Sequence, residues 1–400
     1  MRILFCNYEY PPLGGGGGVI NKLLAEELAR EHDVIVLTSQ AMDLPRQEEL
    51  NGVRIHRVPV LARYSTAAAS YASMASYVAA GWLNGKRILD GEKFDIVNTH
   101  FALPTGPVGL RIARQSRVPH VLTVHGGDAY DPSKFISPHR HAVLRAAVRR
   151  VVRGSFCTIV NSQDTASNVR RFYVSGADVR VLPYGIERPP ELTATTRQAQ
   201  GLEENDFVLV AVGRFVKRKA FDRLIHVFAQ IRNPRFKLML LGDGPLEPDL
   251  RALAAELEVS DRIRFKGFVS EEDKFRLLRI SDAFAYTSQH EGFGIVFLEA
   301  LGAGLPVVCY DKGGQVDFLR DGVNGRVVSL NDEDGFRQAC EDLAGDPARY
   351  DDMSRAARET ASGFYIDAYA KRHLEIFESA IKTAMRVLVL SVGLLPMLDP

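Results

Sequence analysis

The sequence contains little that would mark a disulfide-stabilised or membrane-spanning protein. Its four cysteines are widely separated and form no C-x-x-C pair, which excludes a disulfide scaffold and favours a reducing compartment. The apolar run after Met1 is soon broken by polar residues and prolines, so it is too short for the core of a signal peptide. Near the other end, the apolar stretch over residues 387–398 is also short, since a spanning helix needs about 20 residues. We therefore expect a cytoplasmic protein without a transmembrane helix.

The charge of the chain is nearly balanced overall but unevenly distributed. Residues 1–188 carry 23 Lys and Arg against 16 Asp and Glu, a balance of +7, and residues 189–400 carry 27 against 33, a balance of −6. This asymmetry has two interpretations: scattered surface charge, or a functional basic face on the first half of the chain. We expect no nucleic-acid partner.

The order of apolar segments predicts an α/β protein with two domains. Short β-rich runs alternate with amphipathic helical patterns from the first residue, which is typical of a parallel sheet, and the same rhythm restarts at residue 206. We predict a Rossmann-like domain over residues 1–186, a linker over 187–205, a second Rossmann-like domain over 206–384 and an apolar tail over 385–400. Because open α/β sheets bind ligands at the carboxyl ends of their strands, function is expected in a cleft between these two doubly wound domains.

Five glycines at residues 14–18 follow the first predicted strand and precede a helix. Their backbone amides can approach a phosphate or a sugar closely at a helix N-terminus. The run is not a clean G-x-G-x-x-G, because Val19 stands where a final glycine would be expected, so a nicotinamide site is only weakly indicated. The alternative is a flexible connection without a ligand.

Cations gather where the first strand of the second domain ends. The segment GRFVKRK at residues 213–219 places Arg214 and Lys219 at that carboxyl end. An Arg fork with a mobile Lys suits a diphosphate whose charge grows as it leaves. The alternative interpretation is a solvated basic turn.

Two carboxylates eight residues apart, Glu291 and Glu299, lie in and after the glycine-containing turn that follows another predicted strand. At that separation they cannot share one bound atom, so we expect them to contact different parts of an extended ligand.

His125 ends a predicted strand at another carboxyl edge, where a structural role and a catalytic or sugar-contacting role are both open. Asp332 and Asp334 form a D-x-D, but they precede a helical pattern and are predicted to cap it rather than to bind a metal.

Taken in order, the motifs of the chain resemble the retaining glycosyltransferases of family 4, whose GT-B fold has two Rossmann-like domains. The motifs are the glycine run at 14–18, HGGD at 125–128, LPYGIE at 182–187, GRFVKRK at 213–219, GDGP at 242–245 and HEGFGIVFLEALGAGLPVV at 290–308. The last is the most specific, since it contains the family's E-x7-E pattern as Glu291 and Glu299. The resemblance covers nearly the whole chain, and the apolar ending after residue 384 departs from it.

The resemblance implies a role for each matching residue. Arg214 and Lys219 would hold the donor diphosphate, Glu291 would meet the donor sugar near its anomeric carbon, and His125 would face that sugar from the first domain. Glu299 would hold the ribose hydroxyls. The implied catalytic residues are therefore His125, Arg214, Lys219 and Glu291, and the implied donor-binding residues are Gly15, Gly16, Gly242, Phe268, Phe293, Gly294, Ile295 and Glu299.

The resemblance also implies the reaction. A sugar would pass from a nucleoside diphosphate sugar, with UDP or GDP as the expected carrier, to an acceptor hydroxyl by front-face attack with retained configuration. No cofactor or metal is expected, because protein cations neutralise the leaving group. The acceptor is open, with a lipid-linked or anionic acceptor and peripheral contact of the first domain with the inner membrane face as one hypothesis. A nucleotide-sugar epimerase, a Rossmann dehydrogenase and a non-catalytic binding protein are the alternative functions.

Overall fold

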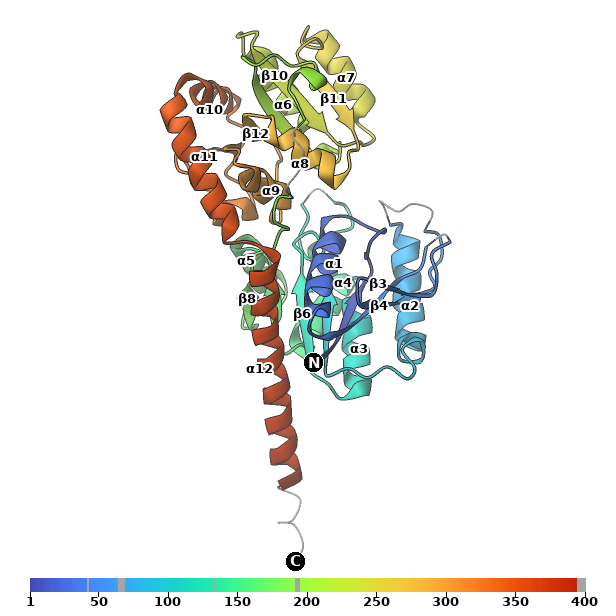
Figure 1. Cartoon of the computed structure of the whole chain (residues 1–400). Coiled ribbons are helices and arrows are strands. Elements are labelled where there is room, and N and C mark those ends of the chain that lie inside the picture. Colours follow the sequence, from blue (N-terminus) through green and yellow to red (C-terminus); the bar gives the residue numbers. More distant parts are fainter. Residues whose placement is uncertain (42, 64–68, 133, 191–194, 394–400) are drawn as a thin grey trace, which may run out of the picture. The chain divides into compact units, whose positions relative to one another are not determined.

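The computed structural model describes residues 1–41, 43–63, 69–132, 134–190 and 195–393, with the side chains of residues 387–393 excluded. It divides the chain into two compact units. Unit 1 contains Met1–Gly185 and the chain from Ile366 onward, and unit 2 is Ile186–Tyr365. Both units are α/β (Figure 1).

Unit 1 is built on an eight-stranded sheet of order β3-β4-β2-β1-β5-β6-β7-β8, parallel except for the β3–β4 pair. Its strands are β1 (Arg2–Asn7), β2 (Asp33–Ser39), β3 (Gln47–Leu50), β4 (Val53–Val58), β5 (Ile96–His100), β6 (His120–Val124), β7 (Thr158–Val160) and β8 (Val179–Val181). Its helices are α1 (Gly16–Ala29), α2 (Tyr71–Ile88), α3 (Gly106–Ser116), α4 (Ala142–Gly154), α5 (Gln163–Phe172) and α12 (Ile366–Gly393).

Helices cover both faces of this sheet, because successive side chains of a strand point to opposite sides. Leu4 and Cys6 of β1 pack in one core cluster with residues of α2 and α3, among them Tyr77 and Val108. Phe5, between them in the sequence, lies 6.3 Å from the ring of Phe377 on α12. The apolar runs of the sequence are therefore buried on both sides.

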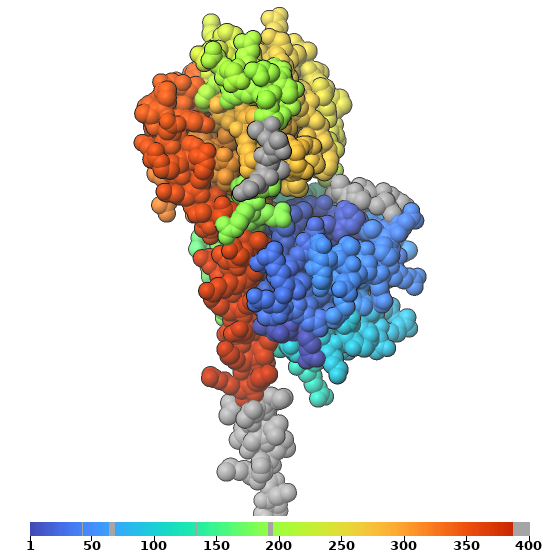
Figure 2. Space-filling view, viewed as in Figure 1, coloured from blue at the N-terminus to red at the C-terminus, as the bar shows by residue number. Residues whose placement is uncertain are grey.

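The end of the chain belongs to unit 1, which differs from the predicted second domain over 206–384. Helix α12 packs on α1 and β6 of unit 1, and Figure 2 shows its red surface lying along the blue surface of the first elements. Tyr369, Ala370, Phe377 and Ala380 are buried by this packing. Amphipathic periodicity predicts that a helix will be covered, but it does not show which sheet will cover it. Of the predicted tail, residues 385–393 continue α12, and 394–400 lie outside the described residues.

Unit 2 has a six-stranded, fully parallel sheet of order β11-β10-β9-β12-β13-β14. Its strands are β9 (Phe207–Val212), β10 (Phe236–Leu241), β11 (Ile263–Gly267), β12 (Ala283–Tyr286), β13 (Val307–Tyr310) and β14 (Gly325–Val328). Its helices are α6 (Phe221–Gln230), α7 (Glu247–Glu256), α8 (Glu271–Arg279), α9 (Ile295–Ala303), α10 (Glu333–Gly345) and α11 (Pro347–Ser362). The restart of the β-α rhythm predicted this second sheet.

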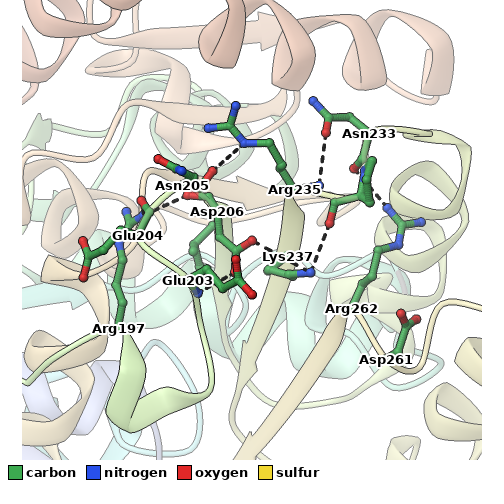
Figure 3. A network of polar contacts seen from close by, with 12 residues as sticks. Arg197, Glu203, Glu204, Asn205, Asp206, Asn233, Arg235, Lys237, Asp261 and Arg262 are labelled. Atoms are coloured by element: carbon green, nitrogen blue, oxygen red, sulfur yellow. Dashed lines mark hydrogen bonds and ion pairs between the residues drawn. The ribbon is translucent and has the colours of Figure 1, made fainter.

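A polar network connects the loops at the amino ends of β9 and β10 (Figure 3). Arg235 donates from Nε to the carbonyl oxygen of Asn205 at 2.7 Å, and Arg197 donates from Nη1 to that of Asp206 at 2.8 Å. Lys237 Nζ lies 3.9 Å from Asp206 Oδ1. Since ligands of parallel sheets bind at the opposite, carboxyl ends of the strands, we attribute this network to the stability of unit 2.

Three features bear on the expectations from sequence. The four cysteines are buried and form no disulfide. Asp332 caps α10 by accepting a hydrogen bond from the Gly335 amide at 2.9 Å, as its position predicted, whereas Asp334 lies in the first turn of the helix and is not its cap. Within the described residues, no helix combines the length and apolar character needed to pass through a lipid bilayer.

Candidate functional site

The predicted donor-binding residues of unit 2 lie in loops at the carboxyl edge of its sheet. Arg214 follows β9, Gly242 follows β10 and Phe268 follows β11. These loops are connected: the Gly242 amide donates to the carbonyl oxygen of Gly267 at 2.7 Å. Arg214 is exposed and Phe268 is 81% exposed, so both side chains are accessible at this edge.

Glu291, which follows β12, is the most strongly held acidic group at this edge. Its carboxylate lies 2.5 Å from Lys219 Nζ and 3.3 Å from Arg218, and it accepts a hydrogen bond from Ser288 Oγ at 2.7 Å. Burial raises the pKa of Glu291, but the attraction of the two cations outweighs burial and lowers the pKa to about 2. Glu291 is therefore ionised at neutral pH.

The two cations exceed the single charge of Glu291, which leaves a positive balance at this point. Lys219 is largely buried, and burial lowers its pKa while Glu291 opposes that effect. A buried positive balance favours the binding of an anion, because the low local dielectric strengthens the attraction. The geometry thus suits a ligand with phosphate groups.

Helix α9 begins beside Glu291 and presents free backbone amides. Its N-cap is Gly294, at φ +87°, a left-handed conformation that favours glycine, and no side chain caps the helix. The first amides of the helix, beginning at Ile295, have no partner within the helix and carry the positive end of its dipole. Phe293, just before the cap, is buried against Phe318. Such a helix N-terminus is suited to an anion, and the donor-binding role of residues 293–295 stays a prediction.

Glu299 lies one turn further along α9 and is held by a different cation from Glu291. Lys274 of α8 places Nζ 2.9 Å from Glu299 and 2.6 Å from Glu271. Burial tends to lower the pKa of Lys274, but the two carboxylates raise it above its ordinary value. The structure therefore places Glu291 and Glu299 in two different ion pairs, and their contact with different parts of a ligand stays a prediction.

In unit 1, the glycine run lies against His125. Gly15 is the N-cap of α1 and Gly16 is its first residue, and both are exposed. A Cβ built on Gly17 would lie 2.6 Å from the Phe101 ring and 3.3 Å from His125 Nδ1, so a larger residue would not fit. The glycine run is therefore a packed loop and not a flexible connection. The Glu9 carboxylate also reaches this loop, accepting from the Gly15 amide at 3.4 Å.

His125 belongs to a chain of hydrogen-bonded side chains at the carboxyl ends of β5 and β6. Asn98 Nδ2 donates to the carbonyl oxygen of Val121 at 3.2 Å, which leaves Asn98 Oδ1 to accept from His100 Nε2 at 2.9 Å. His100 Nδ1 then accepts from His125 Nε2 at 3.0 Å, and His125 Nδ1 accepts from the hydroxyl of Tyr184. The orientation of one amide thus fixes the tautomer of His125.

This chain holds His125 neutral and occupies both of its ring nitrogens. Burial lowers the pKa of His125 to about 3, with a smaller contribution from His373. The backbone is fixed as well, because Asp128 accepts from the His125 amide at 2.9 Å. His125 is therefore positioned by the protein at both nitrogens, and a direct contact with a sugar through a nitrogen requires one of these partners to be exchanged.

The buried imidazoles of unit 1 predict a stability that falls in acid. Burial lowers the pKa of His120 to about 3 and that of His373 to about 4, and His100 is shifted in the same direction. Between pH 6.5 and 4 the unfolded chain binds protons at these positions and the folded chain does not, so the free energy of unfolding should decrease as the pH falls through this range.

Replacing His373 by phenylalanine should make this decrease shallower by about 1.4 kcal/mol per pH unit at most, the effect of one proton. Urea unfolding at pH 7, 6 and 5 measures the slope, and the fluorescence of Trp82, the only tryptophan, reports on unit 1. His226→Phe, at an exposed position on α6, is the control. An unchanged slope in His373→Phe would contradict the assignment.

Several residues of these sites were not predicted from the sequence. Arg218 and Ser288 hold Glu291, and Lys274 holds Glu299. Arg218 stands inside the cationic segment GRFVKRK, so that segment was a usable signal, but nothing in the sequence distinguished which of its cations reach Glu291. Lys274 and the Asn98–His100 pair carry no recognisable motif, because their roles depend on which elements meet in space.

Comparisons with known proteins decide the family. A model described as Glycosyltransferase Family 4 matches residues 14–188, and a model described as Glycosyl transferases group 1 matches residues 193–360. The D-inositol 3-phosphate glycosyltransferase of Frankia alni is 30% identical over 318 residues, which cover 73% of this chain and 75% of that protein. The chain belongs to glycosyltransferase family 4.

Other relatives and solved structures agree with the assignment to glycosyltransferase family 4. The GDP-mannose-dependent α-(1-6)-phosphatidylinositol monomannoside mannosyltransferase of Mycolicibacterium smegmatis is 27% identical over 376 residues, covering 90% of this chain and 93% of that protein. Among solved structures, sucrose-phosphate synthase from Thermosynechococcus elongatus superposes with a TM-score of 0.82 at 20% identity, over 96% of this chain and 100% of that one. Anabaena Alr3699/HepE, solved with UDP-glucose, gives 0.72 at 21% identity, over 95% and 100%.

The glycosyltransferase therefore has the GT-B fold that its motifs predicted, with two Rossmann-like α/β domains. It is a hexosyltransferase of class EC 2.4 that acts on nucleotide sugars. This assignment excludes the dehydrogenase alternative. The glycine run at residues 14–18 had already argued against it, because it is not a clean G-x-G-x-x-G.

Proposed function

We propose that the glycosyltransferase moves a hexose from a UDP or GDP sugar to an acceptor hydroxyl with retention of the anomeric configuration. The observation that carries the proposal is the positive balance around Glu291, beside the uncapped N-terminus of α9. Such a site binds a diphosphate, and its attraction increases as the phosphate gains charge in the transition state.

The roles of the side chains follow from this geometry and from the family. Arg214 and Lys219 hold the diphosphate, and the amides at the start of α9 contact the phosphate and the sugar. Glu291 accepts hydrogen bonds from the sugar hydroxyls, for which its ionised carboxylate is suited. Glu299, fixed by Lys274, holds the ribose hydroxyls, and Phe268 lies where the base would be cradled.

In unit 1, we assign the glycine loop at Gly15 and Gly16 to donor binding and His125 to orientation of the sugar. The amides of Gly16 and Gly17 precede the first hydrogen bond within α1, whereas the Gly15 amide donates to Glu9. The tautomer of His125 is fixed by its neighbours. Neutral His125 at physiological pH can exchange the hydroxyl of Tyr184 for a sugar hydroxyl without a change of charge.

The proposed step is a front-face substitution at the anomeric carbon. The bond from this carbon to the phosphate oxygen breaks, a bond to the acceptor oxygen forms on the same face, and the acceptor proton passes to the departing phosphate. No protein nucleophile or metal takes part, because Arg214, Lys219 and the α9 amides stabilise the charge of the leaving group.

Independence from metal is a direct test of this mechanism. With excess EDTA, transfer should continue at an essentially unchanged rate, since protein cations perform the role that a divalent ion has in other transferases. Release of nucleoside diphosphate, measured with each of a panel of UDP and GDP sugars, identifies the donor and follows the rate. Complete loss of activity in EDTA, restored by magnesium or manganese, would contradict the proposal.

The stereochemical claim and the epimerase alternative are tested on the product. Nuclear magnetic resonance of the new glycoside should show the anomeric configuration of the donor. An epimerase would consume the donor at the same rate without an acceptor, whereas the proposed transferase needs the acceptor for turnover.

We propose a lipid-linked or anionic acceptor bound by unit 1. Two facts support this: residues 1–188 carry the +7 balance, and the mycobacterial relative is named for a phosphatidylinositol acceptor. Peripheral contact with an anionic membrane face is part of the same proposal, since each basic residue near such a surface contributes about 1 kcal/mol.

A further inference from the structure

A cavity of about 250 Å³ lies in the helix layer of unit 1, among α2, α3 and α4. It is separate from the carboxyl-end loops that carry Gly15 and His125. Its apolar wall includes Trp82 of α2, Leu110 of α3 and Val151 of α4. Three arginines, Arg111, Arg114 and Arg150, line the same cavity.

Among the described residues, these three arginines have no carboxylate partner. No acidic residue lines the cavity, and within the part of the chain that the structure describes none of the three lies within ion-pair distance of an Asp or Glu. Some other arginines of unit 1 are paired; Arg54, for example, contacts both Asp33 and Glu92. Three uncompensated guanidinium groups around one cavity repel each other, and an anion would remove that repulsion.

Arg111 gives a second, independent observation. Its guanidinium carbon lies 4.6 Å from the centre of the Trp82 ring, and its Nε is buried without a hydrogen-bond partner. A buried donor without a partner costs free energy, and a small rotation of the Arg111 side chain would let a bound acceptor satisfy it. Arg149, on α4 but outside the cavity, shows the structural alternative, because it donates to the backbone carbonyl of Tyr173 at 3.0 Å.

We propose that this cavity binds a phosphate group attached to an apolar chain or ring. A guanidinium fork matches the oxygens of a phosphate, and three forks around one cavity can hold a doubly charged group. The wall of Trp82, Leu110 and Val151 would cover the apolar part of the ligand, with the indole ring also providing a flat contact surface. The site goes beyond the transfer reaction, because it uses none of the residues assigned to donor binding.

The basic residue of α4 that lines the cavity is not one of those that the sequence pattern groups together. The sequence pattern places Arg145, Arg149 and Arg153 in one basic row, but the cavity is lined by Arg150, which lies on another side of the helix. Among the valines of α4, Val143 is 80% exposed, whereas Val148 and Val151 are buried.

Trp82 allows the site to be tested without any transfer assay. As the only tryptophan, it reports directly on the cavity that it lines. Titration with dihexanoylphosphatidic acid, kept below its micelle concentration, should change the fluorescence in a saturable way. Inorganic phosphate should bind more weakly because it lacks the apolar part, and dihexanoylphosphatidylcholine should give little change because its headgroup has no net charge.

The variant Arg111→Gln/Arg150→Gln should weaken phosphatidic acid binding by about tenfold or more, since charged hydrogen bonds contribute on the order of that factor. Arg153→Gln is the matched control, because Arg153 is exposed on α4 but does not line the cavity. It should bind within about twofold of the wild type. The thermal unfolding temperature of each variant verifies that unit 1 is folded.

Vesicles of phosphatidylcholine with and without phosphatidic acid distinguish the source of the ligand. A response to both monomers and anionic vesicles indicates a bilayer lipid, and a response to monomers alone indicates a free organophosphate; each supports the site. The proposal is overturned if monomers give no saturable change, if the double variant binds as the wild type does, or if only vesicles respond, which would indicate general surface electrostatics. Loss of transfer activity with intact binding would instead count against the proposed reaction.

Discussion

Replacing Arg214 by alanine should lower kcat/KM by about a hundredfold, corresponding to roughly 3 kcal/mol of lost transition-state stabilisation. Arg214 is exposed at the carboxyl end of β9 and, within the described residues, makes no ion pair. Its side chain is therefore available to a diphosphate and contributes little to the fold. The free energy of unfolding should change by less than about 0.5 kcal/mol.

Lys219→Ala should fail in a different way, because Lys219 also holds Glu291. Its Nζ lies 2.5 Å from the Glu291 carboxylate, and both side chains are largely buried. Its removal takes away one charged hydrogen bond of the buried carboxylate and leaves Arg218 and Ser288 to hold it, so this variant should lose about 2 kcal/mol of stability as well as its activity. The ion pair therefore gives Lys219 a structural role in addition to its proposed contact with the diphosphate.

Lys217→Ala provides the matched control for both variants. Lys217 is an exposed cation in the same short segment and has no assigned role. Initial rates over a range of donor concentrations, together with urea unfolding, give the two quantities for each variant. Near-wild-type kcat/KM in Arg214→Ala and Lys219→Ala would remove the diphosphate assignment.

The two glutamates should separate transfer from nucleotide binding. Glu291→Gln should lower the transfer rate by about a hundredfold, since it removes the charged carboxylate that accepts hydrogen bonds from the sugar hydroxyls. Its affinity for the free nucleoside diphosphate should stay close to that of the wild type, because Lys219 and Arg218 remain to bind phosphate. Glu299→Gln should instead weaken that affinity by about tenfold, since it removes a charged acceptor for the ribose hydroxyls.

Calorimetry with UDP and GDP measures these affinities directly. Glu271→Gln is the control for Glu299→Gln: Glu271 contacts the same Lys274 but its side chain is 72% exposed, so its substitution should alter the affinity by less than about twofold. Equal losses of affinity in Glu291→Gln and Glu299→Gln would contradict the division of roles between the two carboxylates.

Much of the fold and part of the site could be predicted from local sequence. Buried strands such as β1 are short apolar runs in the sequence, and the helices between them are amphipathic segments, so two largely parallel sheets could be predicted from this pattern alone. Asp332 was identified as a cap because capping depends on residues only three positions apart. The spacing of Glu291 and Glu299 predicted that they cannot share one bound atom, but their ion pairs with Lys219 and Lys274 were not predicted.

The sequence by itself therefore determined the fold class and family and the positions of the conspicuous cations and carboxylates, since each of these depends on residues that are near one another in the chain. Only the tertiary structure decided which residues pack together, form ion pairs or share hydrogen bonds. It placed helix α12 on unit 1, brought Lys274 to Glu299, and lined up Asn98, His100, His125 and Tyr184. It also enclosed three arginines and Trp82 around one cavity. The physical reason is that the energies of ion pairs, buried hydrogen bonds and packed faces depend on distances in space, which residues far apart in the sequence acquire only when the chain has folded.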